Sequence, residues 1–266
     1  MEQFAIRYFS GTGNTEYATK RFAQALGLAA SDLASIEESD ELPAASEAQT
    51  LIIAYPNYMC CIPKIMKDYL LEHQSDFEGR RLFTLITYAN FFFDCDLLVF
   101  RLLRKQGINF TAAGSLAIQM PMNVCDMRFM KQMPDEEIAR RFDCADLRLA
   151  ERAQALSEGK SLFDGKESER LRAFLRQRMF YGRRMGSYYD GLKIGATCIG
   201  CGLCAARCPL KNLEVKDGKA TQKGRCVQCY RCANLCPASA ITIMGKSVQW
   251  RYNASKQTRD RGSLGK

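Results

Sequence analysis

The chain has 266 residues, of which 47% are hydrophobic and 25% charged, and its formal net charge is +9 at pH 7. This is the composition of an ordinary globular protein, and no apolar run approaches the roughly 18 residues that span a bilayer. Glu2, with no long apolar run behind it, indicates no signal peptide, so we expect a cytoplasmic protein. Secreted disulfide scaffolds are short and loop-rich, so reduced thiols fit the 13 cysteines better.

The first 120 residues alternate between apolar runs and helix-length segments. Four runs are predicted to be strands: Phe4–Phe9, Leu51–Tyr55, Leu82–Thr87 and Ala113–Gln119. Three segments between them are predicted to be helices: Asn14–Leu26, Ile65–His73 and Leu97–Gln106. Continuous apolar strands indicate burial on both faces, as in a parallel sheet covered by helices. This part of the chain is therefore predicted to be a doubly wound α/β domain.

The segments that follow predict how the chain is divided. A charged, alanine-rich stretch from Asp135 to Lys160 is predicted to be a long amphipathic helix that closes the α/β domain. Residues 161–190 are predicted to be a helical, basic connector. We therefore expect an α/β domain at 1–160, this connector, a second domain at 191–250 and a basic tail at 251–266.

A loop rich in glycine and hydroxyl groups, Ser10-Gly11-Thr12-Gly13-Asn14-Thr15, follows the first predicted strand directly. A strand that turns through glycines into a helix presents free N–H groups at the positive end of the helix dipole, which favours anion binding. The loop lacks the Gly-Lys-Ser/Thr of a triphosphate loop, and Glu16 stands where a dinucleotide fingerprint has its third glycine. The pattern therefore predicts an anion site that is neither a triphosphate loop nor a dinucleotide loop.

This loop resembles that of the flavodoxin family, which reads Ser/Thr-x-Thr-Gly-Asn-Thr. The resemblance implies an FMN whose phosphate is held by neutral donors, which here are Ser10, Thr12, Gly13, Asn14 and Thr15. It also implies that the loops after the third and fourth strands of that fold, which here follow Leu51–Tyr55 and Leu82–Thr87, reach the isoalloxazine ring. The predicted ring contacts are Pro56, Asn57, Tyr58, Met59, Thr87, Tyr88 and Asn90. Aromatic residues that only cap the sheet are the alternative, because many flavodoxins have a glycine-rich second loop.

Sulfur-containing residues lie beside these segments. Cys60 and Cys61 belong to the first ring loop, where a thiol can tune flavin chemistry or act as a redox nucleophile. Packing as small buried hydrophobes is the alternative for both. Met120 and Met122 flank Pro121 after the last predicted strand, and packing is the expected role for them.

Eight cysteines of residues 198–237 form a repeat. Cys198-x2-Cys201-x2-Cys204-x3-Cys208-Pro209 recurs 28 positions later as Cys226-x2-Cys229-x2-Cys232-x3-Cys236-Pro237. Thiolates in series suit iron–sulfur clusters, whereas structural zinc sites use paired CxxC knuckles. The single histidine, His73, lies outside the repeat, which excludes a Rieske centre.

The repeat continues beyond the cysteines. Leu213 and Val215 correspond to Ile241 and Ile243, and each pair is predicted to lie on a strand. Asp217-Gly218 predicts a tight hairpin turn in the first copy. About 55 residues are too few for a good hydrophobic core, so bound metal is expected to stabilise the module.

The cysteine repeat resembles the two-cluster bacterial ferredoxins, in which the fourth cysteine of each run binds the other cluster. The resemblance implies one [4Fe-4S] cluster on Cys198, Cys201, Cys204 and Cys236, and a second on Cys226, Cys229, Cys232 and Cys208. Together the two halves resemble flavodoxin–ferredoxin fusion proteins. The expected fold is a flavodoxin-like doubly wound parallel sheet followed by a small α+β dicluster ferredoxin-like domain.

The combined resemblance implies an electron relay between two [4Fe-4S] clusters and FMN, with the connector at 161–190 setting the distance. A flavin-dependent reductase of a small organic substrate, fed by its own ferredoxin domain, is the alternative. A binding module that has lost FMN is a third, against which the intact loop argues. Two clusters and a phosphate would add a charge of roughly −6, so no nucleic-acid partner is expected. The expected partner is a redox protein, acidic if the basic connector and tail form its docking surface.

Overall fold

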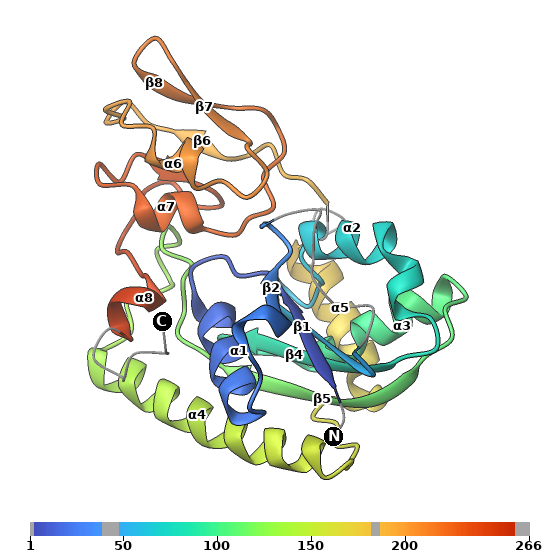
Figure 1. Ribbon diagram of the computed structural model, residues 1–266. Helices are drawn as coiled ribbons and strands as arrows, with labels where there is room; N and C mark the ends of the chain where they lie inside the picture. Colours follow the sequence, from blue (N-terminus) through green and yellow to red (C-terminus); the bar gives the residue numbers. More distant parts are fainter. Residues whose placement is uncertain (1–2, 39–47, 182–186, 259–266) are drawn as a thin grey trace.

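The computed structural model describes residues 3–38, 48–181 and 187–258. Its larger part is a five-stranded parallel sheet with helices on both faces (Figure 1). The strands, in spatial order, are β2 (Leu33–Ser35), β1 (Phe4–Tyr8), β3 (Thr50–Pro56), β4 (Arg81–Tyr88) and β5 (Thr111–Gln119). This order, 2-1-3-4-5, is the flavodoxin-like one, in which the direction of winding reverses between β1 and β3. The doubly wound α/β prediction is confirmed.

Four of these strands were predicted, and β2 was not. The strand has three residues, follows the 3₁₀ turn η1 (Ala30–Asp32) and is followed closely by Glu37 and Glu38. A run this short and so close to acidic residues carries no apolar signal of its own. Pairing with β1, where Ile6 lies opposite Leu33, gives the segment its extended form.

Helices cover the two faces of the sheet separately. On one face lie α1 (Asn14–Ala25) and α4 (Asp135–Ser157), and on the other α2 (Lys64–Glu72) and α3 (Leu98–Lys105). Ile52 of β3 packs into the first apolar cluster and its neighbour Ile53 into the second, because side chains alternate along a strand. Among the described helices, none has the length and apolar character that crossing a membrane requires.

Strand β5 lies at the edge of the sheet, and its outer side is covered. The Ser115 N–H donates to the Leu162 carbonyl (2.8 Å), and the Ala117 N–H donates to Asp164 Oδ2 (2.8 Å). From α4, the Arg148 guanidinium donates to the Ala117 carbonyl (2.9 Å). The segment after α4 therefore satisfies an edge that would otherwise be free to pair with another chain.

The chain then leaves the sheet. It passes through the 3₁₀ turn η4 (Glu167–Glu169) and helix α5 (Arg170–Tyr181). Residues 182–186 of the predicted connector lie outside the described residues. Two further 3₁₀ turns, η2 (Gln74–Phe77) and η3 (Cys95–Leu97), belong to the α/β part.

The cysteine-rich module contains two antiparallel strand pairs and two short helices. The pairs are β6 (Lys193–Ile194) with β9 (Ile241–Thr242), and β7 (Leu213–Lys216) with β8 (Lys219–Gln222). The helices are α6 (Leu203–Ala206) and α7 (Arg231–Leu235), and α8 (Ala254–Gln257) follows the module. Helices α6 and α7, and strands β7 and β9, begin 28 positions apart, so the sequence repeat is also a structural one.

The predicted hairpin turn is present between β7 and β8. Asp217 and Gly218 have φ angles of 49° and 73°. Positive φ at both central residues is what a type I′ hairpin turn requires. The second predicted strand is shorter than expected, because β9 ends at Thr242 and Ile243 follows it.

A buried carboxylate joins the module to the sheet. Asp126, which follows β5, is 1% exposed. Its Oδ1 accepts a hydrogen bond from the Tyr230 hydroxyl (2.9 Å). Its Oδ2 accepts from the backbone N–H groups of Ile243 (2.6 Å), Met244 (3.0 Å) and Gly245 (3.0 Å). A buried charge is tolerated when it is this fully hydrogen-bonded, so Asp126 fixes the module on the sheet.

We predict that Asp126→Asn lowers the free energy of unfolding by about 3 kcal/mol, because an amide cannot accept bonds at both of its atoms. Anaerobic urea denaturation measures the change. Glu151→Gln on the exposed side of α4 is the matched control and should have little effect. Equal stability of the two variants would show that the Asp126 bonds do not hold the halves together.

Candidate functional site

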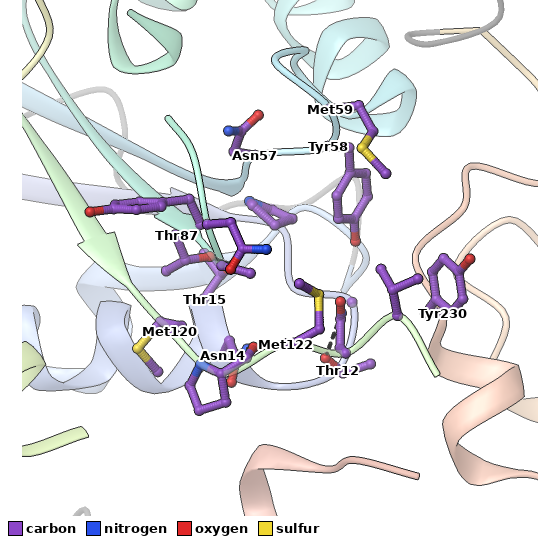
Figure 2. Close-up of a pocket in the computed structure, with 18 of the residues that line it drawn as sticks. Thr12, Asn14, Thr15, Asn57, Tyr58, Met59, Thr87, Met120, Met122 and Tyr230 are labelled. Carbon is purple, nitrogen blue, oxygen red and sulfur yellow. Dashed lines mark hydrogen bonds between the residues drawn. The ribbon is translucent and has the colours of Figure 1, made fainter. Parts of the chain in front are cut away.

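A cavity lies at the carboxyl ends of β1, β3, β4 and β5, where the strand order reverses (Figure 2). All the predicted cofactor-binding residues except Gly13 line it: Ser10, Thr12, Asn14, Thr15, Pro56, Asn57, Tyr58, Met59, Thr87, Tyr88 and Asn90. Gly13 instead precedes α1 with a φ of 97°, a conformation that favours glycine. No Lys, Arg, Asp or Glu is among the described residues that line the cavity.

The loop after β1 is held by its carbonyl groups. Arg231, the first residue of α7, donates from Nη2 to the Ser10 carbonyl (2.5 Å) and from Nε to the Gly11 carbonyl (2.9 Å). The Ala254 N–H donates to the next carbonyl, that of Thr12 (3.1 Å). In a trans peptide the C=O and N–H point in opposite directions. The N–H groups of Gly11, Thr12 and Gly13 therefore point away from these partners, as an anion-binding loop requires.

The side chains of this loop are tied to neighbouring segments. Thr15 Oγ1 lies 2.7 Å from Thr87 Oγ1, which joins the loop to the end of β4. Asn14 Nδ2 donates to the Pro121 carbonyl (2.8 Å), and Asn14 Oδ1 accepts from the Tyr252 hydroxyl (2.6 Å). Much of the hydrogen-bonding capacity of these side chains holds the loop in shape, which leaves its backbone N–H groups as the main free donors.

Residues of the predicted basic tail form part of this support. Tyr252 is 4% and Ala254 1% exposed, and both contact the loop after β1. The segment from 251 to 258 therefore packs on the α/β part in its first half, and residues 259–266 lie outside the described ones. A Cβ at Gly13 would lie 3.0 Å from the Ala254 Cβ, so this contact also limits position 13.

Asn57 joins the two predicted ring loops. Its backbone N–H donates to the Thr87 carbonyl (2.7 Å), and its Nδ2 donates to the Phe91 carbonyl (2.7 Å). Its Oδ1 accepts from the Cys60 N–H (2.8 Å). On the second loop, the rings of Tyr88 and Phe92 lie 4.8 Å apart, and burial raises the pKa of Tyr88. Aromatic surface thus lies beside the cavity, on loops fixed relative to each other.

Tyr58 has a buried hydroxyl without a hydrogen-bond partner among the described residues. Its ring meets Phe9 edge-on, with centroids 6.5 Å apart, and Figure 2 shows the hydroxyl directed towards Thr12. Burial raises the pKa of this phenol well above its usual value. A buried polar group left unpaired is costly, so a ligand atom or water in the cavity would stabilise it.

The two cysteines of the first ring loop differ in position. Cys60 lines the cavity, and Cys61 does not. A hydrogen bond with Cys60, together with burial, raises the pKa of Cys95 well above its usual value. Since a thiolate is the reactive form, Cys95 is a poor nucleophile as it stands.

Several lining residues were not predicted as ligand contacts. One group follows β5: Met120, Pro121, Met122, Asn123, Val124 and Met130. The parallel sheet places the end of β5 beside the ends of β3 and β4, and this signal was available in the sequence. A second group belongs to the cysteine-rich module: Gln228, Tyr230 and Met244. No motif signals these, because they reach the cavity only through packing of the two halves.

The eight repeat cysteines line two smaller cavities, four in each. One is lined by Cys198, Cys201, Cys204 and Cys236, and the other by Cys208, Cys226, Cys229 and Cys232. Each set combines three cysteines of one run with the last cysteine of the other run. In the part of the chain that the structure describes, no three His, Cys, Asp or Glu side chains converge so that they could hold a metal ion.

The two cysteine sets differ in exposure. Cys201 is exposed, whereas Cys226, Cys229 and Cys232 are buried. Burial raises the pKa of Cys226 to about 12 and that of Cys229 to about 11, so these thiols stay protonated unless a cation binds. N–H donation from Ala220 lowers the pKa of Cys198. Cys204 of the first set is buried as well, so the sets differ mainly in the exposure of Cys201.

The second cysteine set meets the loop after β1 directly. A Cβ on Gly11 would lie 2.5 Å from the Cys229 carbonyl oxygen and 2.5 Å from the Tyr58 hydroxyl, so only glycine fits here. Two residues further, Arg231 pairs with Glu37 through Nη1 (2.7 Å) and Nη2 (2.6 Å). The cysteine loop, the loop after β1 and the end of β2 therefore meet at one junction.

We predict that Tyr58→Phe raises the free energy of unfolding of the ligand-free chain by about 1 kcal/mol, because it removes a buried unpaired hydroxyl. Tyr55→Phe is the matched control. Its hydroxyl donates to the Cys95 carbonyl (2.7 Å), so its loss should destabilise by about 1 kcal/mol. Anaerobic urea denaturation measures the free energy of unfolding of both variants. A change of the same sign in both would show that the Tyr58 hydroxyl is not an unpaired buried group.

Comparison with known proteins gave similar folds only. No family model matches the chain, and the search of curated proteins found no match. A two-electron-reduced flavodoxin from Megasphaera elsdenii is 18% identical, covers 57% of this chain and 99% of its own, and has a TM-score of 0.39. A flavodoxin, WrbA-like protein from Agrobacterium tumefaciens is 16% identical, with coverages of 60% and 100% and a TM-score of 0.38. A flavodoxin from the domain Archaea is 14% identical, with coverages of 58% and 99% and a TM-score of 0.37. At these scores, the assignment of the fold rests on the strand order of the sheet.

Proposed function

We propose that the chain is an electron-transfer protein that relays single electrons between two [4Fe-4S] clusters and an FMN. In this proposal residues 1–160 bind FMN, 161–190 connect, 191–250 hold the clusters as a ferredoxin-like domain, and 251–266 follow as the tail. The observation that carries it is the junction at Gly11, where the loop of the second cysteine set packs against the loop after β1. When bound, the clusters supply one-electron transfer and the flavin can hold one or two electrons.

The donors around the larger cavity fit FMN. Backbone N–H groups that point away from Arg231 and Ala254, at the N-terminus of α1, suit a phosphate without any basic side chain. The unpaired Tyr58 hydroxyl offers a further polar contact. Asn57 fixes the two loops that would lie at the isoalloxazine ring. The residues proposed to contact FMN are those predicted from the sequence, with Gly13 acting through its backbone.

The chemistry of the smaller cavities fits iron–sulfur clusters. Each offers four sulfur ligands among apolar residues such as Pro237 and Leu210. Backbone N–H groups donate to sulfur in both sets: Ala220 to Cys198 (3.4 Å), and Gln228 to Cys226 (3.3 Å). Such bonds stabilise the negative charge of bound thiolates and tune cluster potentials.

The exposure of the two sets suggests the order of the relay. Cys201 of the first set is exposed, beside Ile199, whose side chain is 67% exposed. Cys226, Cys229 and Cys232 of the second set are buried, and Gln228 and Tyr230 of the same loop line the larger cavity. We therefore propose that electrons pass between a partner and the first cluster, then the second cluster, then FMN. Lys219 on the β7–β8 hairpin lies near Cys198 of this set, which favours an acidic redox protein as the partner.

Anaerobic purification with cofactor analysis tests the proposal. We expect about eight iron atoms and about one FMN per chain, with the absorbance of both groups. A chain that holds neither flavin nor iron after anaerobic reconstitution would contradict the relay. Iron without flavin would contradict only the role of the larger cavity.

Removal of one cluster at a time tests the arrangement. Cys201→Ala and Cys229→Ala should each lose about four irons. Cys229→Ala should also raise the FMN dissociation constant about tenfold, because its loop packs on Gly11, whereas Cys201→Ala should change it by less than about twofold. Anaerobic titration of flavin fluorescence measures both constants. An equal effect of the two variants would place the second cluster away from the flavin.

The carbonyl contacts of Arg231 predict a further effect. Arg231→Lys keeps the charge beside Glu37 but loses the planar fork that reaches Ser10 and Gly11. We expect the FMN dissociation constant to rise about tenfold, from the loss of two charge-assisted hydrogen bonds. Arg251→Lys, which loses contacts with the Cys236 and Pro237 carbonyls but none with the loop after β1, is the matched control. Unchanged FMN binding in Arg231→Lys would show that the loop keeps its shape without these bonds.

A further inference from the structure

The two copies of the cysteine loop have the same backbone but different residues. In the first copy Gly200 and Gly202 have φ angles of 67° and 73°. In the second copy the corresponding residues are Gln228 and Tyr230, with φ angles of 57° and 60°. Residues other than glycine rarely adopt this left-handed conformation, because Cβ approaches the following carbonyl. The second copy therefore has two strained residues at positions where glycine, as in the first copy, would adopt the same backbone without strain.

One of these two residues has a structural reason to be there. The Tyr230 hydroxyl donates to Asp126, which joins the halves of the molecule. The Gln228 side chain makes no hydrogen bond to any group in the described ranges, although the residue is only 8% exposed. It lines the larger cavity, beside the residues at the ends of β3 and β4. The Gln228 amide is therefore free to hydrogen-bond a molecule in this cavity, and contacts within the chain do not explain it.

We propose that Gln228 is a flavin ligand supplied by the cysteine-rich module, and that its side-chain amide hydrogen-bonds FMN in the larger cavity. This inference rests on the proposed function and adds a specific residue to it. The same residue donates its backbone N–H to Cys226 Sγ (3.3 Å). Gln228 therefore contacts a ligand of the second cluster through its backbone and the flavin through its side chain. The strain at this position is retained because glycine would provide no amide.

Two substitutions at Gln228 separate the amide from the strain. Gln228→Met keeps the length of the side chain and the strained backbone, but removes both hydrogen-bonding atoms. We expect the FMN dissociation constant to rise about fivefold, with the stability of the flavin-free chain not reduced. Gln228→Gly relieves the strain, so the unfolding equilibrium constant of the flavin-free chain should fall about fivefold while FMN binding weakens.

Ser239→Gly is the matched control. Ser239 also has a left-handed φ of 50°, is exposed and lies away from the cavity. This variant should gain stability as Gln228→Gly does, but bind FMN as the wild type does. The full chain with its clusters is used throughout, with anaerobic flavin fluorescence titration for binding and urea denaturation for stability.

The outcomes are distinct. Weaker FMN binding in both Gln228 variants, with unchanged binding in Ser239→Gly, supports the proposal. Wild-type binding in Gln228→Met would overturn it and leave the proposed function standing. A wild-type chain that binds no FMN would overturn the flavin site itself and this ligand with it. A loss of stability in Gln228→Gly would show that the residue is held for packing rather than for a ligand.

Discussion

The guanidinium of Arg231 is the contact on which the site depends. It pairs with Glu37 after β2 and donates to the carbonyls of Ser10 and Gly11, so three segments are fixed by one side chain. Arg231 also follows Cys229 by two residues, which places the second cysteine set beside the same loop. An ion pair buried to this degree adds little net stability, because both charges lose their hydration. Its contribution is to specify one relative position of the two halves.

It follows that the α/β half does not hold the loop after β1 by itself. The carbonyls of Ser10, Gly11 and Thr12 are held by Arg231 and Ala254, which lie more than 200 positions further along the chain. The orientation of the loop N–H groups is therefore coupled to docking of the module. The hydrogen bonds of Asp126 hold the module on the sheet in addition to these contacts.

Much of this arrangement could be predicted from local patterns. Apolar runs such as Leu51–Tyr55 identify buried parallel strands, and the resemblance of the cysteine repeat to two-cluster ferredoxins implies that each run is combined with the last cysteine of the other. β2 is too short to show an apolar run in the sequence, and its extended conformation comes from pairing with β1. Gln228, Tyr252 and Ala254 reach the larger cavity or its loop through tertiary packing, which leaves no periodicity in the sequence. Met120 and Met122 could have been assigned to the cavity, because the end of β5 must share an edge with β3 and β4.

The two copies of the repeat have different residues at the positions where the second copy packs on the sheet. Gly200, Gly202 and Leu203 of the first copy correspond to Gln228, Tyr230 and Arg231 of the second. In the first copy, Cys201 is exposed beside these small and apolar residues. The corresponding polar residues of the second copy line the cavity or bond to Asp126 and the loop after β1. The module packs on the sheet through its second copy, so the residues of the two copies have different surroundings. At positions 228 and 230 the second copy therefore has left-handed residues other than glycine, and at 231 a guanidinium at the junction, where the first copy has two glycines and a leucine.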